Sequence, residues 1–263
     1  MKALPPSTLQ SFSFESPIWR LIGDSQEAFV LLEHRNEATQ EPSFSLFDLA
    51  QHKPLHLHHR FGAGHWISAW ALQAQKAVFV LYAGKENPSQ QAFWVYDFAQ
   101  RRILWEESRY TLRRLVGSSL EVNPRQGAIE QVLYLDLQNG AVRETLSPEN
   151  PKTLINWPQL YHGADPYFGE VNSFLALHNI SASSPPIGYW ELSDKALVSY
   201  LSEQENFLAH FLAVFHAEGH LLEHYLLQEG KPEAFSPIFF IFKNYLFFVK
   251  SKIELVSFPL KSL

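Results

Sequence analysis

Three histidines late in the chain have a spacing that could hold a metal ion. His216, His220 and His224 are four residues apart, so on a helix their imidazoles would share one face, as a zinc site requires. Aromatic and small side chains alternate just before them with the period of two that is typical of a strand. Glu218-Gly219 would then form a two-residue turn. We therefore predict a β-hairpin in which Ala213 faces His224, His216 and His220 lie on opposite faces, and no metal is bound.

A second group of histidines lies earlier in the chain. On a strand, His56 and His58 would share a face and supply two ligands, but the sequence places no third ligand or orienting carboxylate beside them. We interpret the group as surface residues near an outer strand. Its members are His52, His56, His58, His59 and His65.

Other catalytic patterns are missing from the sequence. Gly117-Ser-Ser119 lacks the second glycine and the strand-to-helix context of a nucleophile elbow. No helix is expected after Gly62-Ala-Gly64, which excludes a phosphate-binding glycine loop. Asp48, Asp97 and Asp136 each end an apolar run, and we interpret them as turn formers whose side chains accept backbone amides. The sequence therefore assigns no catalytic residue and favours a protein without enzymatic activity.

The composition excludes several further classes. The 263 residues are 46% hydrophobic, 14% aromatic and 18% charged, with a net charge of −6 and no cysteine. Disulfides and thiolate metal sites are therefore excluded, and the acidic balance argues against nucleic-acid and anionic-membrane partners. Residues 1–7 lack the apolar core of a signal peptide, and no apolar run reaches the roughly 20 residues of a membrane span. We expect a soluble, cytoplasmic protein.

The elements that must position any site are strands. Four alternating apolar runs between Gly64 and Glu107 are separated by turn residues, which predicts a four-stranded antiparallel meander. An apolar strand ending in an acid, followed by a polar turn and a second apolar strand, occurs around Asp48, Asp97, Asp136 and, more weakly, Glu191. Further strands are expected at 211–227, as a hairpin, and at 238–258.

Units of about 40 to 50 residues with four strands each are typical of propeller blades. The two apolar faces of each blade are buried by stacking around an axis. We predict an all-β fold, a single β-propeller domain over residues 1–263. It would have six four-stranded blades, with five as the alternative count. The amino-terminal segment Phe12-Ser-Phe14 would pair with the carboxy-terminal strands and close the ring.

The strand layout resembles propellers of the WD-repeat and quinoprotein type, although the chain has no Trp-Asp signature and no tryptophan-docking motif. The chain also resembles an uncharacterised bacterial family known as a domain of unknown function. The likeness includes Glu33-His-Arg35 after the second strand and His65-Trp66 at the start of the next unit. This resemblance implies no catalytic residue.

First strands of propeller blades line a central channel, and tryptophan beside arginine or histidine at its mouth could bind a sugar or peptide. We therefore predict a non-enzymatic protein that binds a protein or peptide on one face. The alternatives are a small-ligand or carbohydrate binder at the channel mouth, and a metal-dependent hydrolase or isomerase that uses histidines. No cofactor, nucleic acid or membrane is expected, and the oligomeric state is left open. The predicted ligand-binding residues are Arg20, His65, Trp66, Trp70, Arg113, Trp157 and His162.

Overall fold

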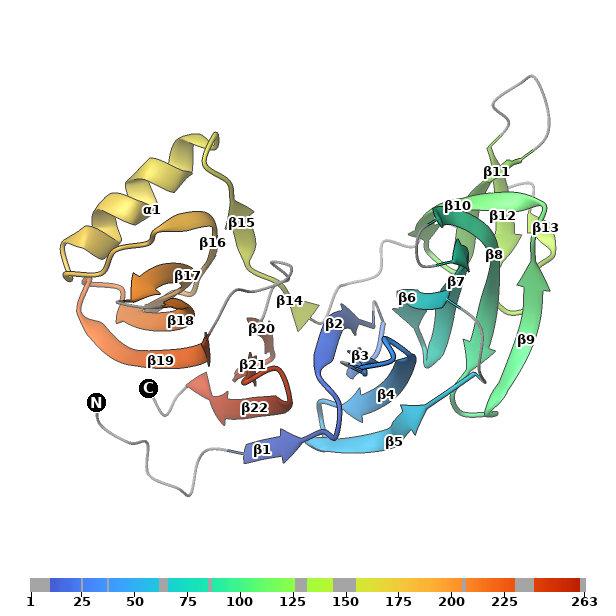
Figure 1. Ribbon diagram of the computed structural model, residues 1–263, viewed down its shortest axis with the longest axis horizontal. Coiled ribbons are helices and arrows are strands. Elements are labelled where there is room, and N and C mark those ends of the chain that lie inside the picture. Colours follow the sequence, from blue (N-terminus) through green and yellow to red (C-terminus); the bar gives the residue numbers. More distant parts are fainter. Residues whose placement is uncertain are drawn as a thin grey trace. The chain divides into compact units, whose positions relative to one another are not determined.

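The computed structural model describes residues 10–24, 26–36, 38–61, 66–84, 87–125, 132–143, 155–204, 207–229 and 239–260. These residues form 22 strands and one α-helix, arranged in five sheets (Figure 1). Packing divides the chain into two compact units, residues 16–155 and residues 1–15 together with 156–263. In the described residues, the helix is too short to cross a membrane.

The unit of residues 16–155 contains three four-stranded antiparallel sheets. The first consists of β2 (Ile18–Gly23), β3 (Phe29–Arg35), β4 (Pro42–Asp48) and β5 (Lys53–His59). The second consists of β6 (Trp66–Gln73), β7 (Lys76–Gly84), β8 (Asn87–Asp97) and β9 (Arg102–Glu107). The third consists of β10 (Tyr110–Val116), β11 (Ser119–Pro124), β12 (Leu133–Asp136) and β13 (Val142–Arg143). Each sheet is a meander, with strands in chain order.

The β6–β9 sheet is apolar on both faces, because its alternating side chains are large and hydrophobic in both directions. Phe79 on β7 packs with Phe44 of the first sheet, at 4.6 Å between ring centroids. Its neighbours Val78 and Val80 point the other way and pack with Val122 of the third sheet. Each face is thus buried against another sheet of the same unit.

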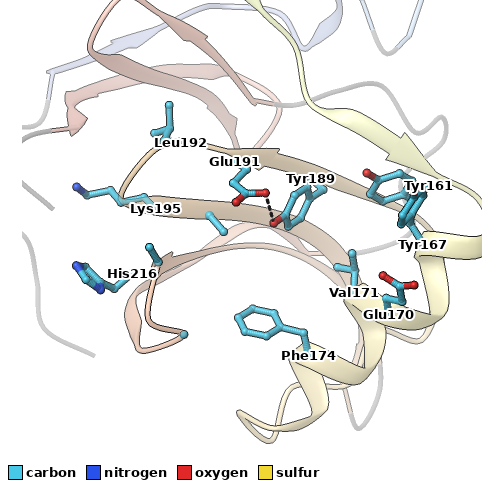
Figure 2. A pocket seen from close by; sticks show the side chains of 13 residues that line it. Tyr161, Tyr167, Glu170, Val171, Phe174, Tyr189, Glu191, Leu192, Lys195 and His216 are labelled. Carbon is cyan, nitrogen blue, oxygen red and sulfur yellow. Dashed lines mark hydrogen bonds between the residues drawn. The ribbon is translucent and has the colours of Figure 1, made fainter.

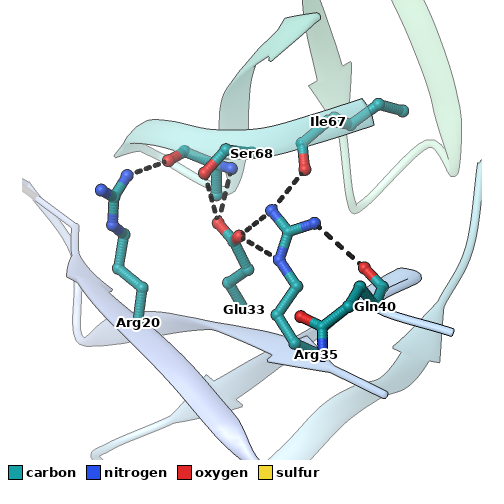
Figure 3. Close-up of polar contacts among 7 residues, drawn as sticks. Arg20, Glu33, Arg35, Gln40, Ile67 and Ser68 are labelled. Carbon is teal, nitrogen blue, oxygen red and sulfur yellow. Dashed lines mark hydrogen bonds and ion pairs between the residues drawn. The ribbon is translucent and has the colours of Figure 1, made fainter. Parts of the chain in front are cut away.

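A buried ion pair also joins the first two sheets (Figure 3). Glu33 and Arg35 lie on β3, and their side chains are 0% and 8% exposed. Glu33 Oε2 accepts a hydrogen bond from the Ala69 amide at 2.8 Å and another from the Ser68 hydroxyl at 2.8 Å. Arg35 Nη2 donates to the Ile67 carbonyl oxygen at 2.8 Å. The charges therefore stay paired while they connect β3 to β6.

The other unit contains two five-stranded sheets. One has the order β15 (Gln159–Tyr161), β16 (Ser184–Glu191), β17 (Lys195–Gln204), β18 (Phe207–His216) and β19 (Leu221–Glu229). The other has the order β1 (Gln10–Ser13), β22 (Glu254–Pro259), β21 (Tyr245–Lys250), β20 (Phe239–Phe242) and β14 (Ile155–Asn156). The helix α1 (Pro166–Ala176) lies between β15 and β16 in the chain.

The β15–β19 sheet is buried on both faces. On one face, Leu197, Leu212 and Val214 pack against Phe239 of β20 and Phe248 of β21, in the other sheet of the same unit. On the opposite face, the helix α1 packs on the sheet through side chains that share a core with β16, β17 and β18, and Figure 1 shows the helix along one side of this sheet. This helix shapes the pocket described below.

The interpretation of the strand-ending acids as turn formers is confirmed. Asp48 Oδ1 accepts the amides of Ala50 and Gln51 at 2.8 and 2.9 Å. Asp136 Oδ1 makes the same two contacts with the amides two and three residues later, and Asp97 Oδ1 accepts the amide of Gln100. These carboxylates hold hairpin turns.

The prediction of a six-bladed propeller is wrong, because the described residues form five sheets in two compact units. The hairpin expected at 211–227 does not begin a unit of its own. Its first strand, β18, pairs over its whole length with β17 and so extends the preceding sheet. The chain ends do pair, since β1 lies antiparallel to β22. The single domain predicted for residues 1–263 stays a prediction.

Candidate functional site

A pocket of about 420 Å³ opens between the helix α1 and the β15–β19 sheet (Figure 2). Three elements supply most of its wall: α1 on one side, and the neighbouring strands β16 and β17 on the other. The β18–β19 turn closes one end. The lining residues are Tyr161, Tyr167, Glu170, Val171, Phe174, Tyr189, Glu191, Leu192, Lys195, Ala196, His216, Ala217 and Gly219.

Two features of the sequence favour the helix α1: a proline in its first turn and an apolar face that packs on the sheet. Pro166 occupies its first turn, where a missing amide hydrogen costs nothing and the fixed φ favours a helix. Val171 and Leu175, four residues apart, are buried against the sheet. Phe174 meets Phe215 of β18 edge to face, with 4.7 Å between ring centroids. The helix is therefore held on the sheet by its inner face.

The same geometry places the helical part of the pocket wall. Tyr167, Glu170, Val171 and Phe174 are spaced i, i+3, i+4 and i+7, so their side chains lie on one side of α1. Figure 2 shows Phe174 and Val171 extending from the helix toward the strands, with Glu170 below Tyr167. One helical face thus carries both apolar and acidic groups into the pocket.

Three tyrosines form the aromatic part of the wall. Tyr161 on β15 and Tyr189 on β16 are diagonal neighbours on the same sheet face, because Tyr161 pairs with Ile187. Their ring centroids are 6.2 Å apart, with 38° between the ring planes. Tyr167 of α1 lies 5.6 Å from Tyr161 at 40°. The rings are therefore tilted toward one another rather than stacked flat.

A hydrogen-bonded pair lies at the centre of the pocket. Tyr189 Oη donates to Glu191 Oε2 at 3.2 Å, and Figure 2 shows this bond in the middle of the wall. Burial raises the pKa of Tyr189 to about 12, and the adjacent charge of Glu191 adds to the increase. The hydroxyl therefore stays protonated and remains a donor to the carboxylate at neutral pH.

The far end of the pocket carries cationic and titratable groups. The Lys195 side chain is 10% exposed and pairs with Asp194, whose side chain is 58% exposed. Side-chain hydrogen bonding to Lys195 lowers the pKa of Asp194. His216 Nδ1 accepts the amide of Glu218 at 3.2 Å, so in the neutral ring the proton is on Nε2. The positive charge of Lys195 is thus already matched by a carboxylate.

The residues predicted to bind a ligand lie elsewhere. Arg20 donates to the Ala69 carbonyl oxygen at 3.0 Å, and the guanidinium of Arg35 lies 4.8 Å from the Trp66 ring centroid. Trp70 packs between the second and third sheets of its unit. Arg113 is exposed, with Nε 3.9 Å from Glu121.

In the other unit, Trp157 meets the Phe240 ring at 5.1 Å, and His162 is an exposed neighbour of Tyr161. His65 lies outside the described residues. Of the predicted residues that the structure describes, none lines the pocket. The ligand-binding role of all seven stays a prediction.

The histidine hairpin is present, since β18 and β19 pair with Ala213 opposite His224. The structure differs from the expectation that His216 and His220 lie on opposite faces, because they face each other across the turn, where the His216 amide donates to the His220 carbonyl oxygen at 2.8 Å. His220 lies in the turn, where strand alternation does not apply, and both imidazoles approach Glu218 Oε2, at 3.9 Å from His216 Nδ1 and 3.8 Å from His220 Nε2. Across the described ranges, no cluster of three or more His, Asp or Glu side chains has the geometry to hold a metal ion.

The earlier histidines are packed among aromatic rings. His59 lies 4.7 Å from the Phe61 ring and 4.8 Å from the Tyr96 ring. His34, which the sequence did not single out, has Nε2 2.9 Å from the Ser45 hydroxyl and Nδ1 3.1 Å from the Ser16 carbonyl oxygen. These contacts anchor the histidines within the first two sheets.

Sequence reasoning missed the pocket because it missed the helix. The signals were present: Asp165-Pro166 is a typical helix start, and the residues after it have helical spacing. Strands are expected on both sides of these residues, and the repeat of β units along the chain therefore outweighs the helix signals. The two strand tyrosines gave no local sign that they would meet.

The stacked sheets define an all-β, multi-sheet class of protein. Within it, residues 23–105 match the family model of a domain of unknown function (DUF4905), which supports the expected likeness to an uncharacterised domain family. The resemblance to WD-repeat and quinoprotein propellers is not confirmed. No curated protein matches the sequence.

Two solved structures resemble the chain in outline. One is a member of the DUF4221 family from Bacteroides vulgatus, with 10% identity, a TM-score of 0.40, and coverage of 98% of this chain and 97% of that one. The other is described as a "putative glycoside hydrolase" from Bacteroides ovatus, with 9% identity, a TM-score of 0.32, and coverage of 97% and 95%. The function must therefore be argued from the site.

Proposed function

We propose that this protein binds a small, ring-bearing polar ligand of the size of a sugar in the pocket between α1 and the β15–β19 sheet. The observation that carries the proposal is the aromatic wall of Tyr161, Tyr167 and Tyr189 around a pocket of about 420 Å³. Small-molecule sites usually measure roughly 300–1,000 Å³ and combine apolar walls with a few polar groups.

The chemistry of the wall suits a carbohydrate. A sugar ring has an apolar face of C–H groups that packs on aromatic rings, while its hydroxyls need hydrogen-bond partners. Glu170 and Glu191 supply carboxylate acceptors beside the tyrosines, and hydrogen bonds to charged acceptors are stronger than neutral ones. This is the carbohydrate-binding alternative from the sequence, moved from a channel mouth to a different set of residues.

The test is a binding screen of mono- and disaccharides by ligand-observed NMR and calorimetry. Tyr167→Ala should weaken any ligand found by about tenfold, because stacked aromatic contacts contribute strongly to binding. Tyr167 is 57% exposed, so this change should leave the fold intact. Trp19→Ala is the matched control, because Trp19 is also an exposed aromatic residue, at 42%, and lies in the other unit. Equal losses in both variants, or no binding of any ligand, would overturn the proposal.

The protein or peptide partner expected from the sequence stays a prediction. Its test is different in kind, because a peptide would cover a surface much larger than this pocket. A bound peptide should protect backbone amides of one sheet edge from hydrogen exchange, whereas a small ligand should protect only residues around α1 and β16.

A further inference from the structure

The charges around the pocket distinguish between kinds of ligand. Glu170 and Glu191 both line the pocket, and within the described residues neither has an ion pair with a lysine, arginine or histidine. Lys195, the one lysine in the lining, is paired with Asp194. The pocket therefore presents two carboxylates whose charges the protein itself does not balance.

Binding of a neutral ligand would be unfavourable for these two carboxylates. Glu170 and Glu191 are both exposed to solvent, so a neutral ligand that packs against them would displace part of their water and supply no opposite charge in return. Covering a carboxylate in this way is costly unless a cation or several donors replace the water. Among the residues that the structure describes, Glu191 has one hydrogen-bond donor, the hydroxyl of Tyr189 at 3.2 Å.

The tyrosines favour a cation for a separate reason. The face of an aromatic ring attracts an ammonium group that lies within about 6 Å of the ring centroid. Tyr161 has a ring neighbour on each side, Tyr167 at 5.6 Å and Tyr189 at 6.2 Å. Because the planes are tilted by 40° and 38°, the three rings form a bent wall. An ammonium group beside this wall could contact aromatic faces in a pocket that Glu170 lines from α1 and Glu191 lines from β16.

We infer that the ligand of the α1–β16 pocket carries an ammonium group that binds between the tyrosine wall and the carboxylates of Glu170 and Glu191. This inference rests on the proposed function and narrows it. The shared chemistry is the ammonium, and its two sources are an amino sugar and a quaternary or alkyl amine. The carboxylates supply the negative charge that attracts the ammonium group, and the tyrosine rings supply the surface that it contacts.

The decisive experiment compares ligands with and without an ammonium group. Calorimetric titration of the full chain with glucosamine and with glucose tests the ammonium on the same ring, and tetramethylammonium tests the cation without a sugar. We expect glucosamine to bind about tenfold more tightly than glucose, with an affinity that falls as salt is added. Binding of tetramethylammonium alone would support the inference and identify the source as a quaternary amine.

Variants separate the role of the carboxylate from that of the fold. Glu191→Gln keeps the shape and removes the charge, and should weaken glucosamine by about tenfold. Glucose should be weakened by a clearly smaller factor, because the amide oxygen of glutamine still accepts a hydrogen bond from a sugar hydroxyl. Glu218→Gln is the matched control: this carboxylate is 76% exposed, lies at the nearby β18–β19 turn and does not line the pocket. Thermal unfolding of both variants checks that they are folded.

The outcomes separate the ammonium inference from the proposal that the pocket binds a sugar. If glucose and glucosamine bind equally well, and Glu191→Gln affects them equally, the ammonium inference is wrong and sugar binding stands. If none of the sugars or amines binds, the proposed function fails as well. A loss of glucosamine binding in Glu218→Gln as large as in Glu191→Gln would also overturn the inference.

Discussion

Arg35 and Glu33, two residues apart on β3, form an ion pair that is almost closed to solvent. Arg35 Nε donates to Glu33 Oε1 at 3.0 Å, and both side chains also bond to the backbone of β6. The pair therefore connects two sheets as well as two charges. Such a pair adds little by itself, but the loss of one partner leaves the other buried and unbalanced.

The variant Arg35→Met should lower the free energy of unfolding by about 3–5 kcal/mol, because it leaves Glu33 buried without its cation. The double variant Glu33→Leu with Arg35→Met should lose less than the single variant, since no buried charge remains. Urea unfolding followed by circular dichroism measures both. Arg109→Met is the control, because Arg109 pairs with Glu107 at the surface with its side chain 76% exposed, and it should cause a far smaller change. A double variant less stable than Arg35→Met would contradict this account.

Stability should fall in acid because of His34. Burial lowers the pKa of His34 to about 4, and the nearby His58 adds to the shift. Between about pH 6.5 and 4 the unfolded chain binds a proton that the folded chain does not, so the free energy of unfolding decreases as the pH drops, by roughly 3 kcal/mol in all. Above pH 6.5 the effect is absent.

Denaturant unfolding at half-unit pH steps measures this slope. His34→Gln should reduce this slope between pH 6.5 and 4. His210, where burial lowers the pKa to about 3, contributes over the same range and on to lower pH, so part of the slope should remain in His34→Gln and should be lost in His210→Gln. If His34→Gln has the same slope as wild type above pH 4, the assignment is wrong.

Gly140 should not tolerate a side chain. Its φ is +72°, and an added Cβ would lie 3.0 Å from Cδ2 of the Trp105 ring. Trp105 is itself held by a hydrogen bond from Nε1 to the Leu137 carbonyl oxygen at 3.0 Å. Gly140→Ala should therefore lower the free energy of unfolding by roughly 1–3 kcal/mol. Gly84→Ala is the control, because nothing lies within 4 Å of its Cβ position. Equal stability of the two variants by thermal unfolding would refute the claim.

The same substitution at Tyr225 and Tyr200 should have opposite effects. The Tyr225 hydroxyl is buried and has no hydrogen-bond partner among the described residues, and burial raises the pKa of Tyr225. Tyr225→Phe should therefore raise the free energy of unfolding by about 1 kcal/mol. The Tyr200 hydroxyl lies 2.5 Å from His224 Nε2, so Tyr200→Phe breaks a hydrogen bond and should lower stability by about 1 kcal/mol. Calorimetric melting of both variants tests the difference in sign.

The strands could be predicted because their signals are local. The four runs between residues 64 and 107 appear as β6 to β9 in the predicted order, and Ala213 faces His224 as expected. Alternation and turn residues decide these features within a few positions. The grouping of strands into sheets could not be predicted in this way. The strand β18 joins β17 through backbone hydrogen bonds, which any sequence can make. Counting units along the chain therefore assigned the hairpin at 211–227 to the wrong sheet.

The candidate site could not be predicted for a related reason. Tyr161, Tyr167 and Tyr189 come from a strand, a helix and a second strand, and they meet only because α1 packs on the sheet through Val171 and Leu175. Nothing in the sequence near Tyr189 indicates this helix. The predicted site used tryptophans and arginines instead, and those residues lie in sheet interfaces or at the surface.

The pairing of β1 with β22 has a consequence for biosynthesis. Ser11 and Glu254, which touch across these two strands, are 243 positions apart, so the ribosome makes one long before the other. The sheets of residues 16–155 have all their partners early and are expected to form first. The β1 strand must wait for its partner until β22 has been made, and an unpaired strand edge can pair with another chain during that interval.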